Sequence, residues 1–546
     1  MSRAKTGCIL VLAAVLLAGA LRVPHLAHRP MHTDEAVHAD RYRLLLDGQY
    51  RYDPTEYHGP TLNYLTLIPA LLSGAGFSYV QITETTLRVV PVFFGVLLVA
   101  LVWLIARDMG PTAAVLAALL TAVSPVMVFY SRYYIQEMLL VAFTFGLIAC
   151  GWRYVREGRL FWALAGGGFA GLMYATKETC IIAFGSMGVA LLAVLLIRQR
   201  RQSLAELTGG IRGRHVAAAV GLAVIVVVLF YSSFLTYPRG VLDSLLTFQT
   251  YFDRAGGGAV HHHPWHYYLR LLAGYRFADG PFFSEGLILV LAVVGTVGVL
   301  WNRCRALHPD LGRFLVVYSW SMAVIYSVIP YKTPWCLLGF YHGMILLAGI
   351  GAAWLLSVGS RTARAACLIL LVFGVAHLGR QAYLAAYVYD ADSRNPWVYA
   401  HTSRNVFVIL DEVKKIAAAD PAGRDMDIQV IVPENDYWPL PWYLRGFGNV
   451  SYDTMVRNAV PAAPLIIAKY PDVDAALRHK LYVLPPPGQK EMYMTLFEVE
   501  LRPQLTLRGY VSYSAWQRFE YSDTADVEAV LNADQKAPDG SQGDRP

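Results

Sequence analysis

The chain has 546 residues, of which 56% are hydrophobic and 16% are charged. Soluble globular proteins carry about 25% charged residues, so much of this surface must face lipid. The net charge of +7 does not indicate nucleic-acid binding, because the basic residues lie mostly at the ends of apolar runs. The six cysteines have no metal-ligand spacing between them, which argues against a zinc site or a disulfide framework and favours apolar filling of helices.

Apolar runs predict about eleven membrane helices within residues 1–379. Several runs reach the roughly 20 residues that a bilayer requires, and others are nearer to about 15. The segment 62–72 is too short to span the bilayer comfortably, and we expect it to form a helix that lies at the membrane interface. The eleven runs are 7–21, 86–106, 112–130, 134–150, 160–176, 179–197, 215–235, 284–301, 313–330, 336–355 and 365–379.

Basic residues predict the orientation of this bundle. Short cytoplasmic connections of membrane proteins are enriched in lysine and arginine, which places the N-terminus inside and residues 22–85, 236–283 and everything after 380 outside. The predicted location is the cell (inner) membrane, among its lipids. Residues 1–21 are interpreted as an uncleaved first helix, and a cleaved signal peptide would leave the sidedness unchanged. The basic residues of the inner connections are Arg3, Lys5, Arg107, Arg153, Arg156, Arg159, Arg198, Arg200, Arg201, Arg212, Arg214, Arg303, Arg305, Arg313, Arg361 and Arg364.

The composition becomes more polar after residue 380. The stretch 405–418 has helical periodicity, and IQVIVP, PLIIAKY and LYVLP are short strand-like runs separated by helix-like polar stretches. This order predicts a small extracytoplasmic α/β domain over 380–532. The charged tail 533–546 is predicted to be disordered. The predicted fold is therefore mainly α, a polytopic transmembrane helix bundle with an outer α/β domain.

Polar residues gather at four places on the predicted outer side. The first outer loop contains Asp34 and Glu35 flanked by histidines, and then His58. Adjacent carboxylates cannot point the same way on a helix, so one can face a cavity while the other binds a metal or caps a helix. A solvated loop with ordinary charges is the alternative interpretation.

The second place is the turn between the third and fourth apolar runs, with Tyr130, Arg132, Tyr133 and Glu137. Glu137 begins an apolar run, and a carboxylate at membrane depth normally faces a protein cavity and has a partner. Arg132 is the nearest candidate in sequence. An interfacial aromatic belt with a snorkelling arginine explains the same residues.

The third place is the turn with Lys177 and Glu178, and Lys332 repeats the situation at a later outer turn. A lysine there can bind a lipid phosphate as a point charge. The alternative is a local pair with Glu178 or contact with lipid head-groups.

The fourth place is the loop 236–283, with His261–His263, Trp265 and His266. Clustered imidazoles can bind a divalent metal, but consecutive histidines seldom all reach one ion. We therefore favour a loop that covers a sugar or phosphate, with Trp265 packed against the ring. Because all four places lie on one side, they indicate a site at the outer interface.

These features, together with an ordered set of short segments, resemble the GT-C membrane glycosyltransferases, which include protein mannosyltransferases and lipid A aminoarabinose transferases. Within them the sequence is most similar to a bacterial and archaeal branch described as flippase-activity-associated and linked by name to archaeal N-glycosylation. The resemblance covers nearly the whole chain to about residue 500. The segments are HTDEAVHA, YHGPTL, RYYIQEM, ATKET, HHPWHYYL, YKTPW, NPWVYAHT and YWPLPWYLR.

The resemblance implies a polyprenyl-phosphate-linked sugar as donor and an inverting transfer. Asp34 matches the family's catalytic carboxylate, which takes the proton from the acceptor hydroxyl, with Glu35 beside it. Charge on the lipid-phosphate leaving group must be stabilised by cations or by a divalent metal, for which Glu35 and Glu137 are the possible ligands. The substrate-binding candidates are His58, Arg132, Tyr133, Lys177, Glu178, His263, Trp265 and Lys332.

Two other functions are weighed against this one. A flippase component or transporter of a lipid-linked saccharide would place ionisable residues near the bilayer midplane, often at broken helices and with internal repeats. Few charges lie deep in the apolar runs, Arg88 being the nearest exception, and no clear repeat is visible. A non-catalytic scaffold would leave the Asp34–Glu35 pair without a purpose. No motif identifies the acceptor as protein, lipid or polysaccharide.

Overall fold

The computed structural model describes residues 3–55, 58–199, 210–256 and 261–522, which form two compact units. The first unit contains Met1–His28 and Arg41–Tyr399, and the second contains Arg29–Asp40 and Ala400–Pro546. The tail 533–546, predicted to be disordered, lies outside the described residues.

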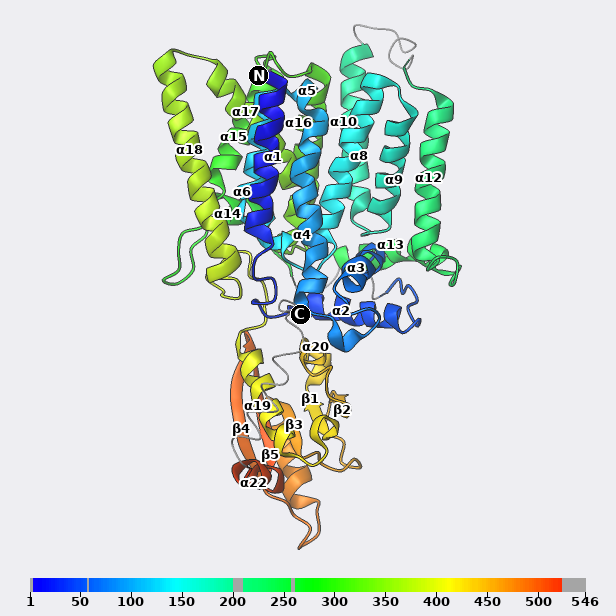
Figure 1. Cartoon of the computed structure of the whole chain (residues 1–546), viewed down its shortest axis with the longest axis vertical. Helices are drawn as coiled ribbons and strands as arrows, with labels where there is room; N and C mark the ends of the chain where they lie inside the picture. Colours follow the sequence, from blue (N-terminus) through cyan, green and yellow to red (C-terminus); the bar gives the residue numbers. More distant parts are fainter. Residues whose placement is uncertain (1–2, 56–57, 200–209, 257–260, 523–546) are drawn as a thin grey trace, which may run out of the picture. The chain divides into compact units, whose positions relative to one another are not determined.

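The first unit is a bundle of helices that run side by side (Figure 1). Each of the eleven predicted apolar runs coincides with helix, and in the described part of the chain eight helices are long and apolar enough to cross a membrane. The predicted helix bundle is confirmed. Its helices are α1 (Arg3–Arg22), α4 (Glu84–Leu101) with η2 (Val102–Ile105) and α5 (Ala106–Met109), α6 (Pro111–Val123), α7 (Pro125–Ser131), α8 (Glu137–Glu157), α9 (Leu160–Tyr174), α10 (Cys180–Gln199), α12 (Gly213–Tyr231), α15 (Gly286–Leu300), α16 (Pro309–Val328), η3 (Pro334–Leu337), α17 (Leu338–Ser357), α18 (Arg361–Tyr383) and the π-turn η4 (Leu384–Val388).

Three of the eleven runs do not form one long helix. Helices α9 and α15 have 15 residues each. The run 112–130 is broken at Ser124, where α6 and α7 meet with a bend of 59°. Pro125 is the first residue of α7, a position where its missing N–H is not needed, and the Ser124 side chain accepts a hydrogen bond from the backbone of Met127.

Shorter helices occupy the connections 22–85 and 236–283. The apolar segment 62–72 is helical, as predicted, and forms α3. The two later helices fall in the connection 236–283. The connecting helices are α2 (Thr33–Leu46), α3 (Thr61–Leu72), η1 (Tyr79–Gln81), α13 (Gly240–Gly256) and α14 (Tyr267–Ala273).

Glycines let neighbouring bundle helices approach closely. A Cβ on Gly167 of α9 would lie 2.1 Å from the carbonyl oxygen of Ala219 in α12, and one on Gly295 of α15 would lie 2.0 Å from that of Leu347 in α17. Both distances are shorter than van der Waals contact allows. Membrane helices use such small residues at their interfaces, because packing replaces the hydrophobic effect as the force that associates them.

The second unit is built on a five-stranded sheet with the order β2-β1-β3-β5-β4. Strand β1 is parallel to β2 and β3, whereas β5 is antiparallel to β3 and β4. The mixture of strands and helices confirms the predicted α/β character, and α19 confirms the helix predicted for 405–418. The elements are α19 (Asn405–Ala419), η5 (Gly423–Asp425), β1 (Ile428–Ile431), η6 (Pro433–Asn435), α20 (Leu440–Tyr443), β2 (Val450–Asp453), β3 (Leu465–Tyr470), α21 (Asp474–Arg478), the π-turn η7 (His479–Val483), β4 (Tyr493–Arg502), β5 (Leu505–Ser512) and α22 (Tyr513–Glu520).

One predicted strand is wrong. The segment LYVLP at 481–485 begins inside the π-turn η7. Val473, Leu477 and Leu481 are all buried in one hydrophobic cluster, and their spacing of four residues is that of a helix face. Packing of this face therefore overrides the strand preference of a short Leu-Tyr-Val run.

Candidate functional site

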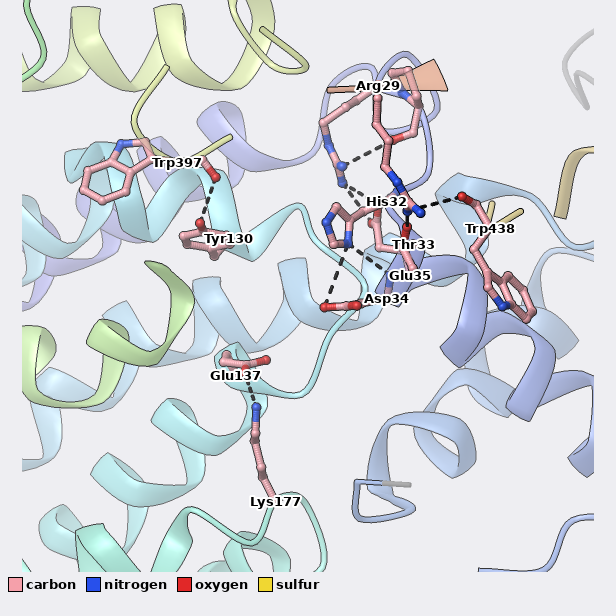
Figure 2. Close-up of polar contacts among 12 residues, drawn as sticks. Arg29, His32, Thr33, Asp34, Glu35, Tyr130, Glu137, Lys177, Trp397 and Trp438 are labelled. Atoms are coloured by element: carbon pink, nitrogen blue, oxygen red, sulfur yellow. Dashed lines mark hydrogen bonds and ion pairs between the residues drawn. The ribbon is translucent and has the colours of Figure 1, made fainter. Parts of the chain in front are cut away.

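An ion pair between Lys177 and Glu137 lies at one end of the helix bundle. Glu137 is the first residue of α8, and Lys177 lies in the short connection from α9 to α10. The Lys177 ammonium donates a hydrogen bond to the Glu137 carboxylate, and the two side chains are only 8% and 7% exposed (Figure 2). Burial alone would lower the pKa of Lys177, but the Glu137 carboxylate holds that pKa above its ordinary value. The ammonium therefore stays charged.

Glu178, the next residue, pairs with His58 instead. The Nδ1 atom of His58 is 3.0 Å from Oε2 of Glu178. Burial alone would raise the pKa of Glu178, but the His58 imidazole and the Lys177 ammonium lower it to about 2. Two adjacent residues of one connection thus hold opposite charges, and each is paired with a side chain from another segment.

The start of α3 is fastened to the same connection. The backbone N–H of Thr61 donates to the carbonyl oxygen of Ala175 at 3.2 Å, and the hydroxyls of Thr61 and Thr176 are 2.8 Å apart. Position 59 must be glycine here, because a Cβ would lie 2.2 Å from the Ala175 carbonyl oxygen. The structure thus brings together four predicted site residues from separate segments of the chain, His58, Glu137, Lys177 and Glu178.

Lys177 retains capacity to bind a further group. An ammonium carries three N–H donors, and among the described residues Glu137 is the one side chain to which it donates. Phosphate oxygens are strong acceptors for a charged donor. The site can therefore hold an anionic group against Lys177, while Glu137 keeps the buried charge compensated before that group arrives.

In the second unit, Glu35 lies in the first turn of α2 and is engaged in capping that helix. Arg29 donates to both carboxylate oxygens of Glu35, at 2.9 and 2.8 Å. Glu35 also accepts the backbone N–H of His32 at 3.0 Å, and Nδ1 of His32 accepts the N–H of Asp34 at 3.0 Å (Figure 2). These reciprocal bonds form a capping box with His32 at the N-cap.

The neighbouring Asp34 carboxylate is open. Its side chain is 40% exposed, and Nδ1 of His32 lies 3.9 Å from Oδ2. No hydrogen bond to this carboxylate occurs within the part of the chain that the structure describes. A carboxylate without donors has its lone pairs free to accept a proton.

Arg132, a substrate-binding candidate from the sequence, caps a helix in the structure. Its guanidinium donates to the carbonyl oxygens of Arg22, Pro24 and His25 at 2.7, 2.6 and 3.1 Å. Arg22 is the last residue of α1, and Pro24 and His25 lie in the turn that follows. The guanidinium also lies 4.4 Å from the ring centroid of Tyr387. A cation is favourable at a helix C-terminus because the terminal carbonyls carry negative partial charge.

The aromatic candidates Tyr133 and Trp265 have contrasting surroundings. Tyr133 is fully buried, and its ring stacks on that of Trp335 with a centroid distance of 6.2 Å. Trp265 is 69% exposed. The Trp265 side chain is therefore open in the structure, whereas Tyr133 is part of the packed interior.

Lys332 ties the histidine loop to the turn before η3. The backbone N–H of Lys332 donates to the carbonyl oxygen of His261 at 3.0 Å. The Lys332 ammonium donates to the carbonyl oxygens of Ile329 and His263. Burial lowers the pKa of Lys332. The rings of His261 and His263 both approach the Tyr399 hydroxyl, at 2.5 and 3.4 Å. Lys332 and His263 are thus brought together in a closely bonded turn.

Comparison with known proteins identifies the architecture. The family model of dolichyl-phosphate-mannose-protein mannosyltransferase matches residues 64–231. ArnT from Cupriavidus metallidurans bound to undecaprenyl phosphate superimposes with a TM-score of 0.58 at 15% identity, over 92% of this chain and 97% of ArnT. The apo state of that ArnT gives a TM-score of 0.60 at 14% identity, over 93% and 98% of the two chains. This chain has the GT-C fold.

A more distant GT-C structure agrees. Archaeal oligosaccharyltransferase AglB from Archaeoglobus fulgidus, in complex with an inhibitory peptide and a dolichol-phosphate, superimposes with a TM-score of 0.50 at 13% identity, over 85% of this chain and 69% of AglB. None of the curated proteins matches the sequence. At these identities the likeness concerns the fold.

The side chains proposed as metal ligands on this GT-C scaffold do not form a donor set. Within the described residues, no group of three or more His, Cys, Asp or Glu side chains could hold a metal ion. Of the two candidates from the sequence, Glu137 is paired with Lys177, and Glu35 is paired with Arg29. Among the described residues, the two carboxylates are therefore each occupied by a cationic side chain.

Sequence reasoning missed two buried charges of the GT-C bundle. Glu285 is 1% exposed and accepts hydrogen bonds from Ser124 and Tyr341, and Arg22 is fully buried. Glu285 stands at the start of an apolar run, like Glu137. The criterion that drew attention to Glu137 would therefore have found Glu285 as well.

Proposed function

We propose that this GT-C protein transfers a sugar from a polyprenyl-phosphate donor to a hydroxyl of an acceptor at the outer face of the cell (inner) membrane. The observation that carries the proposal is the buried, charged Lys177 with free N–H donors at an end of the bundle. The fold adds support, because the superimposed structures include ArnT bound to undecaprenyl phosphate and AglB with a dolichol-phosphate.

Lys177 is proposed to bind the lipid phosphate. As the bond between the sugar C1 and the phosphate oxygen breaks, negative charge grows on the phosphate, and a preorganised cation stabilises that charge in the transition state. Glu137 keeps Lys177 protonated and in position. Glu178, which follows Lys177 in the chain, and its partner His58 are proposed to contact the donor.

Asp34 is proposed to be the general base of an inverting transfer. Its open carboxylate would take the proton of the acceptor hydroxyl as the acceptor oxygen forms a bond to C1 from the side opposite the phosphate. Glu35, which holds the start of α2 through Arg29, would position Asp34. On this basis Arg132 and Tyr133 are left out of direct substrate contact.

The histidine loop is proposed to cover the donor sugar. Lys332 and His263 shape this loop through backbone contacts, and the exposed ring of Trp265 supplies an apolar face. Stacking of a sugar on such a ring is the expected contact.

A second candidate function is movement of a lipid-linked saccharide across the bilayer without transfer. The observation that favours it is the broken α6–α7 span with the buried charges Arg22 and Glu285 next to it, since transporters often bind their substrates at broken helices. The absence of a visible internal repeat weighs against it.

A transfer assay with purified protein tests the proposal. Wild-type protein in lipid nanodiscs should release labelled sugar from a polyprenyl-phosphate sugar, and Asp34→Asn should lower that rate at least a thousandfold without changing the thermal midpoint. Asp47→Asn is the matched control, because Asp47 lies directly after α2 and forms an exposed ion pair with Arg43. Lys177→Gln should raise the KM for the donor and also lower kcat, because the ammonium is proposed to stabilise the charge that grows on the phosphate.

The same preparation separates the two candidates. If wild-type protein transfers no sugar from any polyprenyl-phosphate donor but moves a labelled lipid across vesicle membranes, the transferase assignment is wrong and the flippase alternative is supported.

A further inference from the structure

The short helix α7 connects the broken span to the ion pair of the proposed donor site. It follows the 59° bend at Ser124 and leads through Arg132 and four more residues to Glu137, the first residue of α8. All seven residues of α7 are buried. The position of Glu137 therefore depends on how firmly α7 is held.

Glu285 holds the N-terminal end of α7. Its Oε1 accepts the backbone N–H of Val126 at 2.8 Å, and its Oε2 accepts the hydroxyls of Ser124 and Tyr341, each at 2.6 Å. The first N–H groups of a helix have no partner within the helix. The Glu285 carboxylate supplies one from α15, a different part of the bundle.

Arg22 holds the other side of the break. Its guanidinium donates to the carbonyl oxygens of Thr121 and Ala122 at 3.0 and 2.8 Å, at the C-terminal end of α6. Its Nε also donates to the hydroxyl of Ser131 at 3.0 Å, at the C-terminal end of α7. One side chain thus joins the end of α6 to the end of α7.

The two charges match the helix ends that they meet. A helix carries partial positive charge at its N-terminus and partial negative charge at its C-terminus, so the carboxylate suits α7 and the guanidinium suits α6. Within the described residues, neither Glu285 nor Arg22 forms an ion pair with another side chain. Each charge is hydrogen-bonded to groups of the broken span, and Glu285 also accepts from Tyr341 of α17.

The far end of α7 is fixed as well. Arg132, which follows it directly, caps α1, and the Tyr130 hydroxyl donates to the carbonyl oxygen of Trp397 at 2.8 Å (Figure 2). A seven-residue helix has little stability of its own, so these side chains decide its position.

We propose that Glu285 and Arg22 are positioning residues that clamp the α6–α7 break and, through α7, set Glu137 against Lys177 for binding of the donor phosphate. The inference rests on the proposed function for its ligand. It also gives the broken span a role in a transferase, where the break places a charged pair and carries no substrate through the membrane.

Binding of undecaprenyl phosphate without sugar tests this inference independently of transfer. Glu285→Gln keeps the shape of the side chain and removes its charge, and we expect it to weaken the affinity for undecaprenyl phosphate at least fivefold. Ser124→Ala, which removes one partner, should weaken it about twofold and remains informative if Glu285→Gln does not fold. Thr296→Val is the matched control. It removes the acceptor of the 2.9 Å hydrogen bond that the Trp320 indole N–H donates within the bundle, away from the α6–α7 break.

A double variant shows whether the effect passes through Glu137. Glu137→Asp shortens the partner of Lys177, and its effect on affinity should combine with that of Glu285→Gln to less than the product of the two. An unchanged affinity in Glu285→Gln, or effects that multiply fully, would overturn the inference while leaving the proposed function standing. Failure of wild-type protein to bind undecaprenyl phosphate would instead remove the proposed function, and the inference with it.

Discussion

The Lys177 ammonium donates a hydrogen bond to the Glu137 carboxylate, although the two residues are 40 positions apart in the chain. Both side chains are almost completely buried. Burying one charge in such surroundings without its partner costs several kcal/mol. Each of the two charges therefore offsets the burial cost of the other. The pair is therefore a structural unit as well as the proposed phosphate site.

Removing one member of this pair should destabilise the bundle more than removing both. We expect Glu137→Gln or Lys177→Met alone to cost roughly 3–5 kcal/mol, because either leaves an uncompensated buried group. The double variant should cost less than either single variant, because it leaves no uncompensated charge. Thermal unfolding of the four proteins in one detergent measures this, and additive effects would show that the two side chains do not interact.

Glu178 predicts a dependence of stability on acid pH. Its pKa falls from 4.5 to about 2 in the folded state, so its contribution is complete above pH 4.5 and is lost as the pH falls toward 2. By pH 3 the loss should be about 2 kcal/mol. The thermal midpoint of wild-type protein should therefore drop between pH 5 and pH 3 more than that of Glu178→Gln, and equal slopes would contradict the assignment.

Asp34 and Glu35 should respond differently to the same chemical change. Glu35→Gln removes the carboxylate that accepts from buried Arg29, and we expect it to lower stability by about 3 kcal/mol. The folded fraction should lose only part of its kcat, as expected for a residue that positions Asp34. Asp34→Asn should leave the thermal midpoint unchanged and abolish most of kcat. Parallel measurement of thermal midpoints and kcat separates the two, and a catalytic loss without destabilisation in Glu35→Gln would give Glu35 a chemical role.

Chelation tests the metal ligands predicted from the sequence. Because the carboxylates of Glu35 and Glu137 are each paired with a cation, we expect transfer activity to change less than twofold after dialysis against EDTA. Restoration of a lost activity by one divalent cation would contradict this expectation and show that a donor set assembles when substrate binds.

Hydrophobic length predicted the bundle well, because each membrane helix needs its own long apolar run. It could not show the break inside 112–130, where Pro125 looks like one more residue of a continuous run and the bend depends on side chains from α1 and α15. In the second unit, the hairpin of β4 and β5 was not predicted, because β4 is partly exposed and both strands carry charged residues.

The candidate residues of the site were found by type, but their partners were not. His58 pairs with Glu178 across 120 positions, a relationship that no local pattern encodes. The sequence suggested Glu137 as the partner of Arg132 because the two residues are close in the chain. In the structure, the Arg132 guanidinium instead donates to carbonyl oxygens at and just after the end of α1. Closeness in sequence does not predict side-chain partners where the ends of several helices meet.

The absence of a side chain at Gly59 has a consequence for how a lipid could enter. A Cβ at this position would clash with the Ala175 carbonyl, and residues 58–61 are hydrogen-bonded to residues 175–178. If the proposed lipid donor enters beside these residues, we expect both segments to move together, with His58, Lys177 and Glu178. The lipid would then enter along the edges of these two joined segments and not between them.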